Sequence, residues 1–286
     1  MNFLSLDERL NDALIEDLGR GDVTTDAVIK SVGPNGRKAT AQVLAKEDLV
    51  LAGWHILVRV FRLLGPVEDK VSFGEGDLVT KGSVIGEVRG EAGTLLKGER
   101  VALNILQRMC GIASETRQFA KRVAHTRARV LDTRKTTPLW RDLEKYAVRA
   151  GGGFSHRQGL DDGILIKENH IVIAGGLTKA IEACRQAASH LQRLEVEVRN
   201  LDELKVALQA GVDVVLLDNM SVEQVRKAVE LVKGRAQVEV SGGIGLDNVA
   251  AYAEAGVDFV SLGALTHSYR SRDISIELDA QGSPSG

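Results

Sequence analysis

At 286 residues the chain is long enough for two domains, or for one large α/β domain with an appendage. Its 44% hydrophobic residues can form a sizeable core. A formal net charge of −2 argues against a general nucleic-acid or membrane-surface function, and no window approaches the roughly 20 apolar residues of a membrane span. With no apolar signal core after Met1 and only two cysteines, Cys110 and Cys184, at no metal-ligand spacing, the composition predicts a soluble cytoplasmic protein with reduced thiols.

The N-terminal part of the chain alternates between helical and strand patterns. Residues 6–18 carry apolar side chains at helical spacing, and Gly19 ends this stripe. Residues 20–25 indicate a capped turn, and residues 37–50 alternate as in a strand. Residues 53–64 place their apolar side chains on one side of a helix. We therefore expect helices and strands to follow one another here.

Glycines separate short apolar runs between residues 66 and 95, a spacing typical of β-hairpins. The pattern from Gly76 to Ile85 is similar to the sandwich folds of lipoyl and biotinyl carriers, so a carrier domain is one interpretation. A carrier needs a modifiable lysine at a hairpin tip, and Lys81 lacks the residues that usually flank one. We therefore favour hairpins without a carrier function.

A long helical pattern follows over residues 94–122. Arg100, Asn104 and Arg108 are spaced four apart within it, so they share one face of the helix. The pattern leaves two interpretations open, a solvated face with salt bridges or a functional surface.

Strand and helix patterns alternate regularly after residue 128, and Ser221 with Gln224 predicts one helix cap. Expected strands are 128–131, 163–166, 194–198, 213–217, 236–240 and 258–262, and expected helices are 138–150, 178–191, 201–210, 222–232 and 247–255. Regular βα units build a parallel sheet, and continuous winding favours a barrel. An open doubly wound sheet is the alternative, but no G-x-G-x-x-G motif follows the first strand.

The stretch Thr133-Arg134-Lys135-Thr136-Thr137-Pro138 lies between the first of these strands and the next helix. Pro138 suits the first helical position and Thr137 can cap it, so we expect a basic turn at a helix N-terminus. Such an end favours anions, because it contributes free N–H groups and partial positive charge. A solvated turn without a function is the alternative.

Polar side chains follow the expected strands at their carboxyl ends, where barrel enzymes carry their chemistry. These ends hold Arg134–Lys135, Lys167–His170, Glu197–Arg199, Asp218–Asn219, Ser241–Gly243 and Gly263, and His156–Arg157 follow a glycine turn near the same rim. The cationic members are Arg134, Lys135, His156, Arg157 and Lys167. Because arginine suits planar carboxylates and phosphates, we expect the site to hold a compact polyanion.

The remaining strand ends predict further ligands. The backbone N–H groups of the Ser241–Gly243 turn and of Gly263 are expected to hold a phosphate. Glu197 and Asp218 suit Mg²⁺ or sugar hydroxyls, since hard cations take oxygen ligands and carboxylates accept hydroxyl hydrogens. Turns that need glycine for their backbone, and carboxylates that only balance the cations, are the alternatives.

At these positions the sequence resembles the quinolinate phosphoribosyltransferase family nearly from end to end. The motifs that carry the resemblance are EDLGRGDVTT (16–25), GERVALN (98–104), TRKTTP (133–138), SHR (155–157), KENH (167–170), EVEV (195–198), LDN (217–219) and SGGI (241–244). Each motif is weak alone, but their order and spacing together are specific.

The resemblance implies an N-terminal α/β sandwich domain over residues 1–115 and an α/β barrel of six or seven parallel strands over residues 116–269. A seventh strand is expected near residues 152–155, and the tail 270–286 is expected to pack on the N-terminal domain. The family also works as a homodimer, in some cases a hexamer, in which Arg100 of one subunit would complete the partner's site.

The family's reaction is phosphoribosyl transfer to quinolinate with decarboxylation, which gives nicotinate mononucleotide, pyrophosphate and CO₂ in NAD biosynthesis. The resemblance assigns Arg134, His156, Arg157, Lys167 and the partner's Arg100 to quinolinate, and Lys135 to the phosphates of phosphoribosyl pyrophosphate. It assigns Glu197 and Asp218 to ribose hydroxyls and Mg²⁺, and Ser241, Gly242, Gly243 and Gly263 to the 5′-phosphate. The expected catalytic residues are Lys135, Lys167, Glu197 and Asp218, with Mg²⁺ as the cofactor.

Two departures from the family pattern lie beside the expected site, although neither replaces a charged residue. Leu139-Trp140 stands where many relatives have a glycine, and Phe154-Ser155 precedes His156 where an asparagine is common. Two other enzymes stay open: a paralogue that acts on another acid, such as the relatives linked to molybdenum transport, and a Schiff-base aldolase that uses Lys167. The His156–Arg157 pair with Lys167 favours a dicarboxylate.

Overall fold

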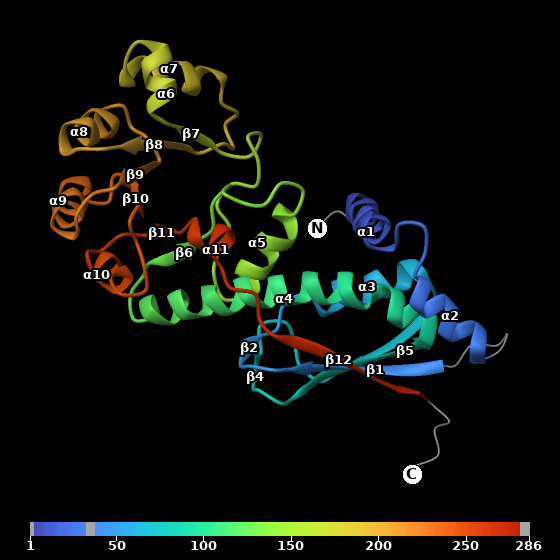
Figure 1. Ribbon diagram of the computed structural model, residues 1–286. Helices are drawn as coiled ribbons and strands as arrows, with labels where there is room; N and C mark the ends of the chain where they lie inside the picture. Colours follow the sequence, from blue (N-terminus) through green and yellow to red (C-terminus); the bar gives the residue numbers. More distant parts are fainter. Residues whose placement is uncertain (1–2, 33–37, 281–286) are drawn as a thin grey trace. The chain divides into compact units, whose positions relative to one another are not determined.

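A computed structural model describes residues 3–32 and 38–280, and Figure 1 shows the chain coloured along its sequence. The chain forms two compact units. Unit 1 contains residues 1–115, 138–151 and 269–286, and unit 2 contains residues 116–137 and 152–268. Residues 138–151, which the sequence places in the barrel region, therefore belong with the N-terminal part of the chain.

Unit 1 is built around a four-stranded antiparallel sheet in the order β12–β1–β5–β3. The strands are β1 Lys38–Ala45, β3 Val67–Val71, β5 Val84–Glu91 and β12 Ile274–Ala280, and β2 Leu49–Val50 pairs separately with β4 Leu78–Val79. The helices are α1 Phe3–Leu18, α2 Val23–Val32, α3 Trp54–Leu64, α5 Arg141–Ala150 and the first part of α4 Ala92–Val123. Helices α3 and α4 cover one face of the sheet (Figure 1).

The core of unit 1 follows from the two periodicities of its sequence. Ala41, Val43 and Ala45 alternate along β1 and are fully buried, because successive strand residues point to opposite faces. Helix α3 buries Ile56 and Phe61 completely on the side that the sequence predicts. Each large apolar side chain contributes about 1.5–3 kcal/mol when it leaves water.

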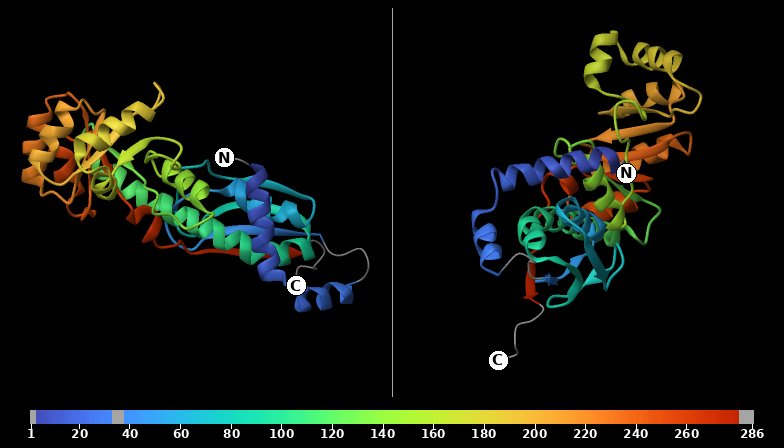
Figure 2. Two further views of the ribbon diagram at one scale, coloured as in Figure 1. Left: turned by 90° about the horizontal axis from the view of Figure 1, so that it is seen from above. Right: turned by 90° about the vertical axis from the view of Figure 1, so that its right-hand side faces the viewer.

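Unit 2 contains a six-stranded parallel sheet in the order β6–β11–β10–β9–β8–β7. The strands are β6 Arg129–Leu131, β7 Ile164–Ile166, β8 Leu194–Val198, β9 Val214–Asp218, β10 Gln237–Ser241 and β11 Phe259–Ser261. The helices are α6 Glu168–Ala174, α7 Leu177–Ala187, α8 Leu201–Gln209, α9 Val222–Val232, α10 Val249–Glu254 and α11 Ala264–His267. Helices α7 to α10 pack on the outer side of the parallel strands (Figures 1 and 2).

The expected α/β barrel with a separate N-terminal domain is thus confirmed. A seventh element also lies where the sequence predicts one. The Phe154 amide donates to Val130 O and the Asp132 amide donates to Phe154 O, which makes a single parallel bridge beside β6. The expected cap of α9 is present as well, since Ser221 Oγ accepts from the Gln224 amide and Gln224 Oε1 accepts from the Ser221 amide.

The helix expected at Pro138 begins three residues later. Helix α5 starts at Arg141 with Trp140 at its N-cap position. Leu139 has a φ of 69°, in the left-handed region, so the backbone leaves the helical conformation before that point. Pro138 is therefore not the first helical residue and Thr137 is not the cap, and the expectation of a helix N-terminus at the basic turn is wrong.

Three helices form where the sequence predicts none, namely α2, α6 and the four-residue α11. Asp22 accepts hydrogen bonds from the amide and the hydroxyl of Thr25 at 2.9 and 2.5 Å, and this expected turn opens α2. Helix α6 buries none of its residues, so it has no apolar stripe from which to be predicted. Within the described part of the chain, no helix is long and apolar enough to cross a membrane.

Candidate active site

A cavity of about 300 Å³ opens in unit 2 at the carboxyl ends of the parallel strands. The sequence-predicted residues that line it are Arg134, Lys135, His156, Arg157, Lys167, Glu197, Asp218 and Ser241. The other lining residues are Thr133, Leu165, Leu216, Glu239 and Ser261. The five predicted cations therefore face one cavity together with the two predicted carboxylates.

The basic turn after β6 is held by side-chain hydrogen bonds rather than by a helix. Thr133 Oγ1 accepts from the Lys135 amide at 3.0 Å, and Thr266 Oγ1 donates to the Lys135 carbonyl at 2.8 Å. Arg134 Nε is buried and has no hydrogen-bond partner among the described residues. The turn thus presents two cations, but it lacks the helix N-terminus whose dipole was expected to strengthen anion binding there.

The opposite side of the cavity pairs a cation with a carboxylate. Lys167, directly after β7, places its Nζ 3.0 Å from Glu197 Oε2 on β8. The Lys167 side chain is half exposed, whereas that of Glu197 is only 12% exposed. Asp218 closes β9 and accepts from Asn219 Nδ2 at 2.8 Å. Two carboxylates from neighbouring strands therefore supply oxygen ligands to the same cavity, which suits a hard divalent cation.

Two of the predicted phosphate-binding glycines, Gly242 and Gly263, lie where an added Cβ would collide with a neighbouring side chain. Gly242 has a φ of 94°, and a Cβ at this position would lie 2.2 Å from Asn219 Oδ1. Gly263 allows the Lys135 stem to pass, because a Cβ there would lie 2.9 Å from Lys135 Cδ. Gly242, Gly243 and Gly263 do not line the cavity itself. Gly242 and Gly243 follow the lining residue Ser241 in sequence, and Gly263 lies beside the lining residue Lys135.

Arg100 belongs to the other unit. It is exposed on α4 within residues 1–115, so it is not among the residues that unit 2 brings together. A cavity of about 410 Å³ in unit 1 lies along the sheet edge at β3 and β5 and contains no predicted site residue. The candidate chemistry of the described residues is therefore concentrated in unit 2.

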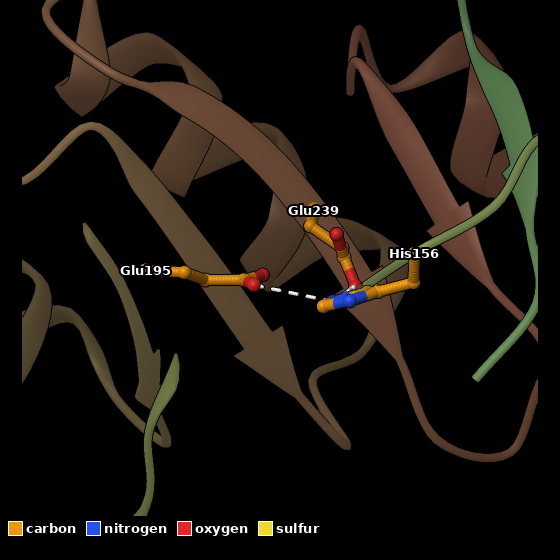
Figure 3. Close-up of side chains that lie close together, drawn as sticks. All are labelled: His156, Glu195 and Glu239. Atoms are coloured by element: carbon orange, nitrogen blue, oxygen red, sulfur yellow. Dashed lines mark ion pairs between the residues drawn. The ribbon is translucent and has the colours of Figure 1, made fainter. Parts of the chain in front are cut away.

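His156 is held by two buried glutamates that the sequence argument did not assign to the site (Figure 3). Its Nε2 lies 3.1 Å from Glu195 Oε2 and 3.5 Å from Glu239 Oε1. Ser261 Oγ donates a further hydrogen bond to Glu239 Oε1. A signal was present in the sequence, because a carboxylate at a core position of a buried strand needs a partner. The sequences of β8 and β10 do not, however, show which residue this partner is.

Burial and the charges of this cluster shift the pKa values of Glu195 and His156. Burial raises the pKa of Glu195 to about 6, and the nearby Glu239 adds to this shift. Burial lowers the pKa of His156 and the hydrogen bonds to both glutamates raise it, but a second proton on Nδ1 would break the bond that this nitrogen accepts from the Arg157 amide, so the contacts hold a neutral ring. The Arg157 amide donates to His156 Nδ1 at 2.7 Å, so this nitrogen keeps a lone pair and the imidazole hydrogen lies on Nε2.

The sequence matches two family descriptions in succession. Residues 22–110 match the quinolinate phosphoribosyl transferase N-terminal domain, and residues 112–277 match the C-terminal domain of the same family. The chain belongs to the quinolinate phosphoribosyltransferase family. The family membership and the fold are thus those that the motifs predicted.

Named relatives agree with this membership. A probable nicotinate-nucleotide pyrophosphorylase (carboxylating) of Bacillus subtilis is 42% identical over 97% of this chain and 95% of its own. A mitochondrial quinolinate phosphoribosyltransferase (decarboxylating) of Nicotiana tabacum is 39% identical over 96% of this chain and 83% of its own. Among solved structures, NadC from Streptococcus pyogenes matches with a TM-score of 0.92 and 40% identity over 98% of both chains. Francisella tularensis nicotinate-nucleotide pyrophosphorylase matches with a TM-score of 0.90 and 36% identity over 96% of both chains.

Proposed function

We propose that this protein transfers the phosphoribosyl group of phosphoribosyl pyrophosphate to quinolinate and decarboxylates the product to nicotinate mononucleotide. The observation that carries the proposal is the cavity of about 300 Å³ in unit 2, in which four cations, the His156 ring and two carboxylates meet at the strand ends of a family member. The cations suit a dicarboxylate and a pyrophosphate, and the carboxylates suit the ribose that connects them.

The quinolinate side of the cavity consists of Arg134, His156, Arg157 and Lys167 in this proposal. Arg134 lies close enough to act on Arg157, since burial and then the charge of Arg134 lower the pKa of Arg157. Two guanidinium groups that repel each other gain most from a ligand with two adjacent carboxylates. This pairing favours a dicarboxylate over a monocarboxylate as the acceptor substrate.

The phosphoribosyl pyrophosphate side consists of Lys135, Glu197, Asp218 and the turns that contain Gly242, Gly243 and Gly263. Lys135 would contact the phosphates, and backbone N–H groups of the glycine turns would hold the 5′-phosphate. Glu197 and Asp218 would hold Mg²⁺, directly or through the ribose hydroxyls. When bound, Mg²⁺ supplies neutralisation of the charge on the departing pyrophosphate.

The reaction then follows from charge and orientation. The quinolinate nitrogen forms a bond to ribose C1 while the bond from C1 to the pyrophosphate oxygen breaks, and the anionic Glu197 and Asp218 stabilise positive charge on the ribose. The pyridinium nitrogen next accepts the electron density of the bond from C2 to its carboxylate, which leaves as CO₂, and C2 takes a proton. No side chain has to act as a nucleophile.

We also propose a homodimer in which Arg100 reaches the partner's cavity, and a cytoplasmic location. The exposure of Arg100 on α4 supports the first proposal, because the side chain is accessible to another subunit. The absence of a disulfide at Cys110 and Cys184 agrees with the second.

The test of the function uses quinolinate labelled in its C2 carboxyl group, phosphoribosyl pyrophosphate and Mg²⁺. We expect labelled CO₂ and nicotinate mononucleotide in equal amounts, and neither product when Mg²⁺ is chelated. No release of label from a folded protein would contradict the proposal. Borohydride treatment with carbonyl substrates tests the aldolase alternative, which requires covalent trapping at Lys167.

A further inference from the structure

His156 lies in a wall between two cavities of unit 2. The substrate cavity is on one side, and a second cavity of about 280 Å³ lies on the other, at the amino ends of the strands. His156, Arg157 and Glu239 line both cavities, whereas Glu195 lines only the second one. Glu195 therefore supports His156 from the side away from the substrate cavity, whereas Glu239 lies in the wall between the two cavities.

Contacts at both ring nitrogens and at the backbone amide fix the orientation of His156. Its Nε2 faces Glu195 and Glu239, and its backbone amide donates to Asp132 Oδ1 at 2.9 Å. Its Nδ1 accepts from the Arg157 amide at 2.7 Å. Both ring nitrogens and the main chain are thus engaged, and the two glutamates that hold Nε2 are only 7% and 2% exposed. Buried carboxylates of this kind have few alternative positions.

The imidazole in turn holds the main chain of Arg157. This residue lies between the Phe154 bridge and β7, where no regular strand pairing is present among the described residues. Its amide bonds to His156 Nδ1, and its Nη1 donates to Gly163 O at 3.1 Å. A rotation of the His156 ring would remove the first of these contacts and release the backbone that carries the guanidinium group.

We propose that Glu195 and Glu239 are positioning residues for quinolinate, which hold the His156 ring and through it the backbone and guanidinium group of Arg157. The inference rests on the proposed function, because it assumes that Arg157 contacts the quinolinate carboxylates. It assigns the two glutamates no contact with phosphoribosyl pyrophosphate. Their removal should therefore weaken the binding of quinolinate and leave the binding of phosphoribosyl pyrophosphate nearly unchanged.

A divalent metal is the competing explanation of the cluster, since the ligand atoms of His156, Glu195 and Glu239 lie within 4.8 Å of one another. A metal would need the lone pair of Nε2, and a neutral imidazole would then carry its hydrogen on Nδ1. The Arg157 amide occupies Nδ1 as a donor, so the hydrogen has to lie on Nε2. This hydrogen-bond pattern favours a held imidazole over a metal ligand.

The experiment compares Glu195→Gln, Glu239→Gln, Glu195→Ala and Glu239→Ala, with Asp258→Asn as a control. Asp258 Oδ2 accepts from the Val238 amide at 2.8 Å near the amino end of the same sheet and lines neither cavity. For each alanine variant we expect the KM of quinolinate to rise roughly tenfold or more, with the KM of phosphoribosyl pyrophosphate within about twofold. The glutamine variants keep an oxygen that accepts from Nε2–H, so they should recover most of the loss.

Equal increases in both KM values, no change in either, or glutamine variants as impaired as the alanine variants would overturn the positioning role. If one alanine variant does not fold, the other alanine variant carries the comparison, and a glutamine variant that raises both KM values equally still overturns the role. Failure of the function itself is separate, because wild type and Asp258→Asn would then form no nicotinate mononucleotide.

Nitrogen-15 NMR of the histidine rings provides a readout that does not depend on turnover. In wild type we expect His156 to carry its hydrogen on Nε2, with Nδ1 as an acceptor, and in the alanine variants we expect this signature to be lost. Titration with Zn²⁺ alone should leave the wild-type signal unchanged. Loss of the Nε2 hydrogen on addition of Zn²⁺ would show a metal site and overturn the proposal.

Discussion

Arg134 and Lys135 are neighbours in the chain but have different surroundings. Arg134 is close enough to Arg157 for its charge to lower the pKa of that residue. Lys135 runs beside Gly263, and its carbonyl accepts from Thr266, both at the start of α11. One cation therefore faces the side that we assign to quinolinate, and the other faces the side that we assign to the phosphates.

This difference predicts that two adjacent substitutions weaken the binding of different substrates. Arg134→Ala should raise the KM of quinolinate about 10- to 100-fold, because a charge-assisted hydrogen bond contributes about 1.5–3 kcal/mol. Lys135→Ala should raise the KM of phosphoribosyl pyrophosphate by a similar factor. Steady-state kinetics with each substrate varied in turn measures both values. The division of labour is wrong if both variants weaken the same substrate.

At the scale of the elements, the turn after β10 depends on the absence of a side chain at Gly242. The residue has a positive φ, and Asn219, at the end of β9, approaches it from the neighbouring strand. The Asn219 amide donates to Ser241 O at 2.9 Å, which ties the two strand ends together. A Cβ at Gly242 would lie 2.2 Å from Asn219 Oδ1 and 3.1 Å from the Asn219 backbone nitrogen, so the Asn219 side chain would have to move.

Gly242→Ala should lower the free energy of unfolding by about 1–3 kcal/mol and also weaken phosphoribosyl pyrophosphate binding. Gly234→Ala is the matched control, because Gly234 also has a positive φ, 74°, but has no atom within 4 Å of its added Cβ. It should carry the backbone strain without the collision. Chemical denaturation measures the free energy of unfolding of both variants. Equal losses would show that the contact with Asn219 contributes nothing.

The attachment of β12 to β1 depends on another pair of distant elements. Glu47, between β1 and β2, accepts hydrogen bonds from Arg270, from Arg272 Nη1 at 3.1 Å and from the Asp273 amide at 2.8 Å. Arg270 above all, together with the other two donors and against the effect of burial, lowers the pKa of Glu47 to about 2. The carboxylate therefore stabilises the folded state.

This shift predicts a pH-dependent effect of Glu47→Gln. A lowered pKa in the folded state contributes stability that is fully present above the unfolded value of about 4.5 and is lost as the pH falls towards 2. At pH 7 the variant should lose roughly 0.5–1 kcal/mol, a range typical of partly exposed ion pairs. Glu277→Gln is the control, because its contact with Lys46 is exposed and 3.8 Å long.

Thermal melts of both variants and wild type between pH 7 and pH 3 provide the measurement. The deficit of Glu47→Gln should shrink as the pH falls through this range, whereas Glu277→Gln should follow wild type throughout. A deficit that stays constant with pH would mean that the shape of the Glu47 side chain matters and its charge does not.

At the scale of the whole molecule, the predicted quinolinate ligands come from two different units. Arg134 lies in unit 2 and Arg100 lies in unit 1. If Arg100 acts in the partner's site, Arg100→Ala and Arg134→Ala damage different subunits of the same site. A hybrid dimer then contains one intact site. Equal mixing should restore roughly a quarter of wild-type activity, since about half of the dimers are hybrids with one intact site in two.

The measurement is activity of the two inactive variants before and after subunit exchange, which is verified with two affinity tags. Mixing Arg134→Ala with Lys135→Ala is the control, because both changes lie in unit 2 and every hybrid site keeps one of them. No recovery in the first mixture despite exchange would show that Arg100 does not act across subunits.

The sequence alone determined the parallel sheet and most of the cavity. Period-2 and period-3.6 patterns depend on neighbouring residues, so the strands around Leu194–Val198 and Val214–Asp218 and the cap at Ser221 could be read locally. The rim followed from one further rule, that the carboxyl ends of parallel strands meet at one edge. This rule groups Arg134, Lys167, Glu197 and Asp218 without any knowledge of tertiary contacts.

Only the tertiary structure decided which residues hold this rim in place. His156 meets Glu195 and Glu239 across 39 and 83 positions of sequence, separations at which no local pattern identifies a partner. The same holds for residues 138–151, which join unit 1 through contacts between distant segments, and for Leu139, whose left-handed backbone moves the start of α5. Local sequence specifies each element and its exposed ligands, whereas buried contacts depend on packing between elements that are remote in the chain.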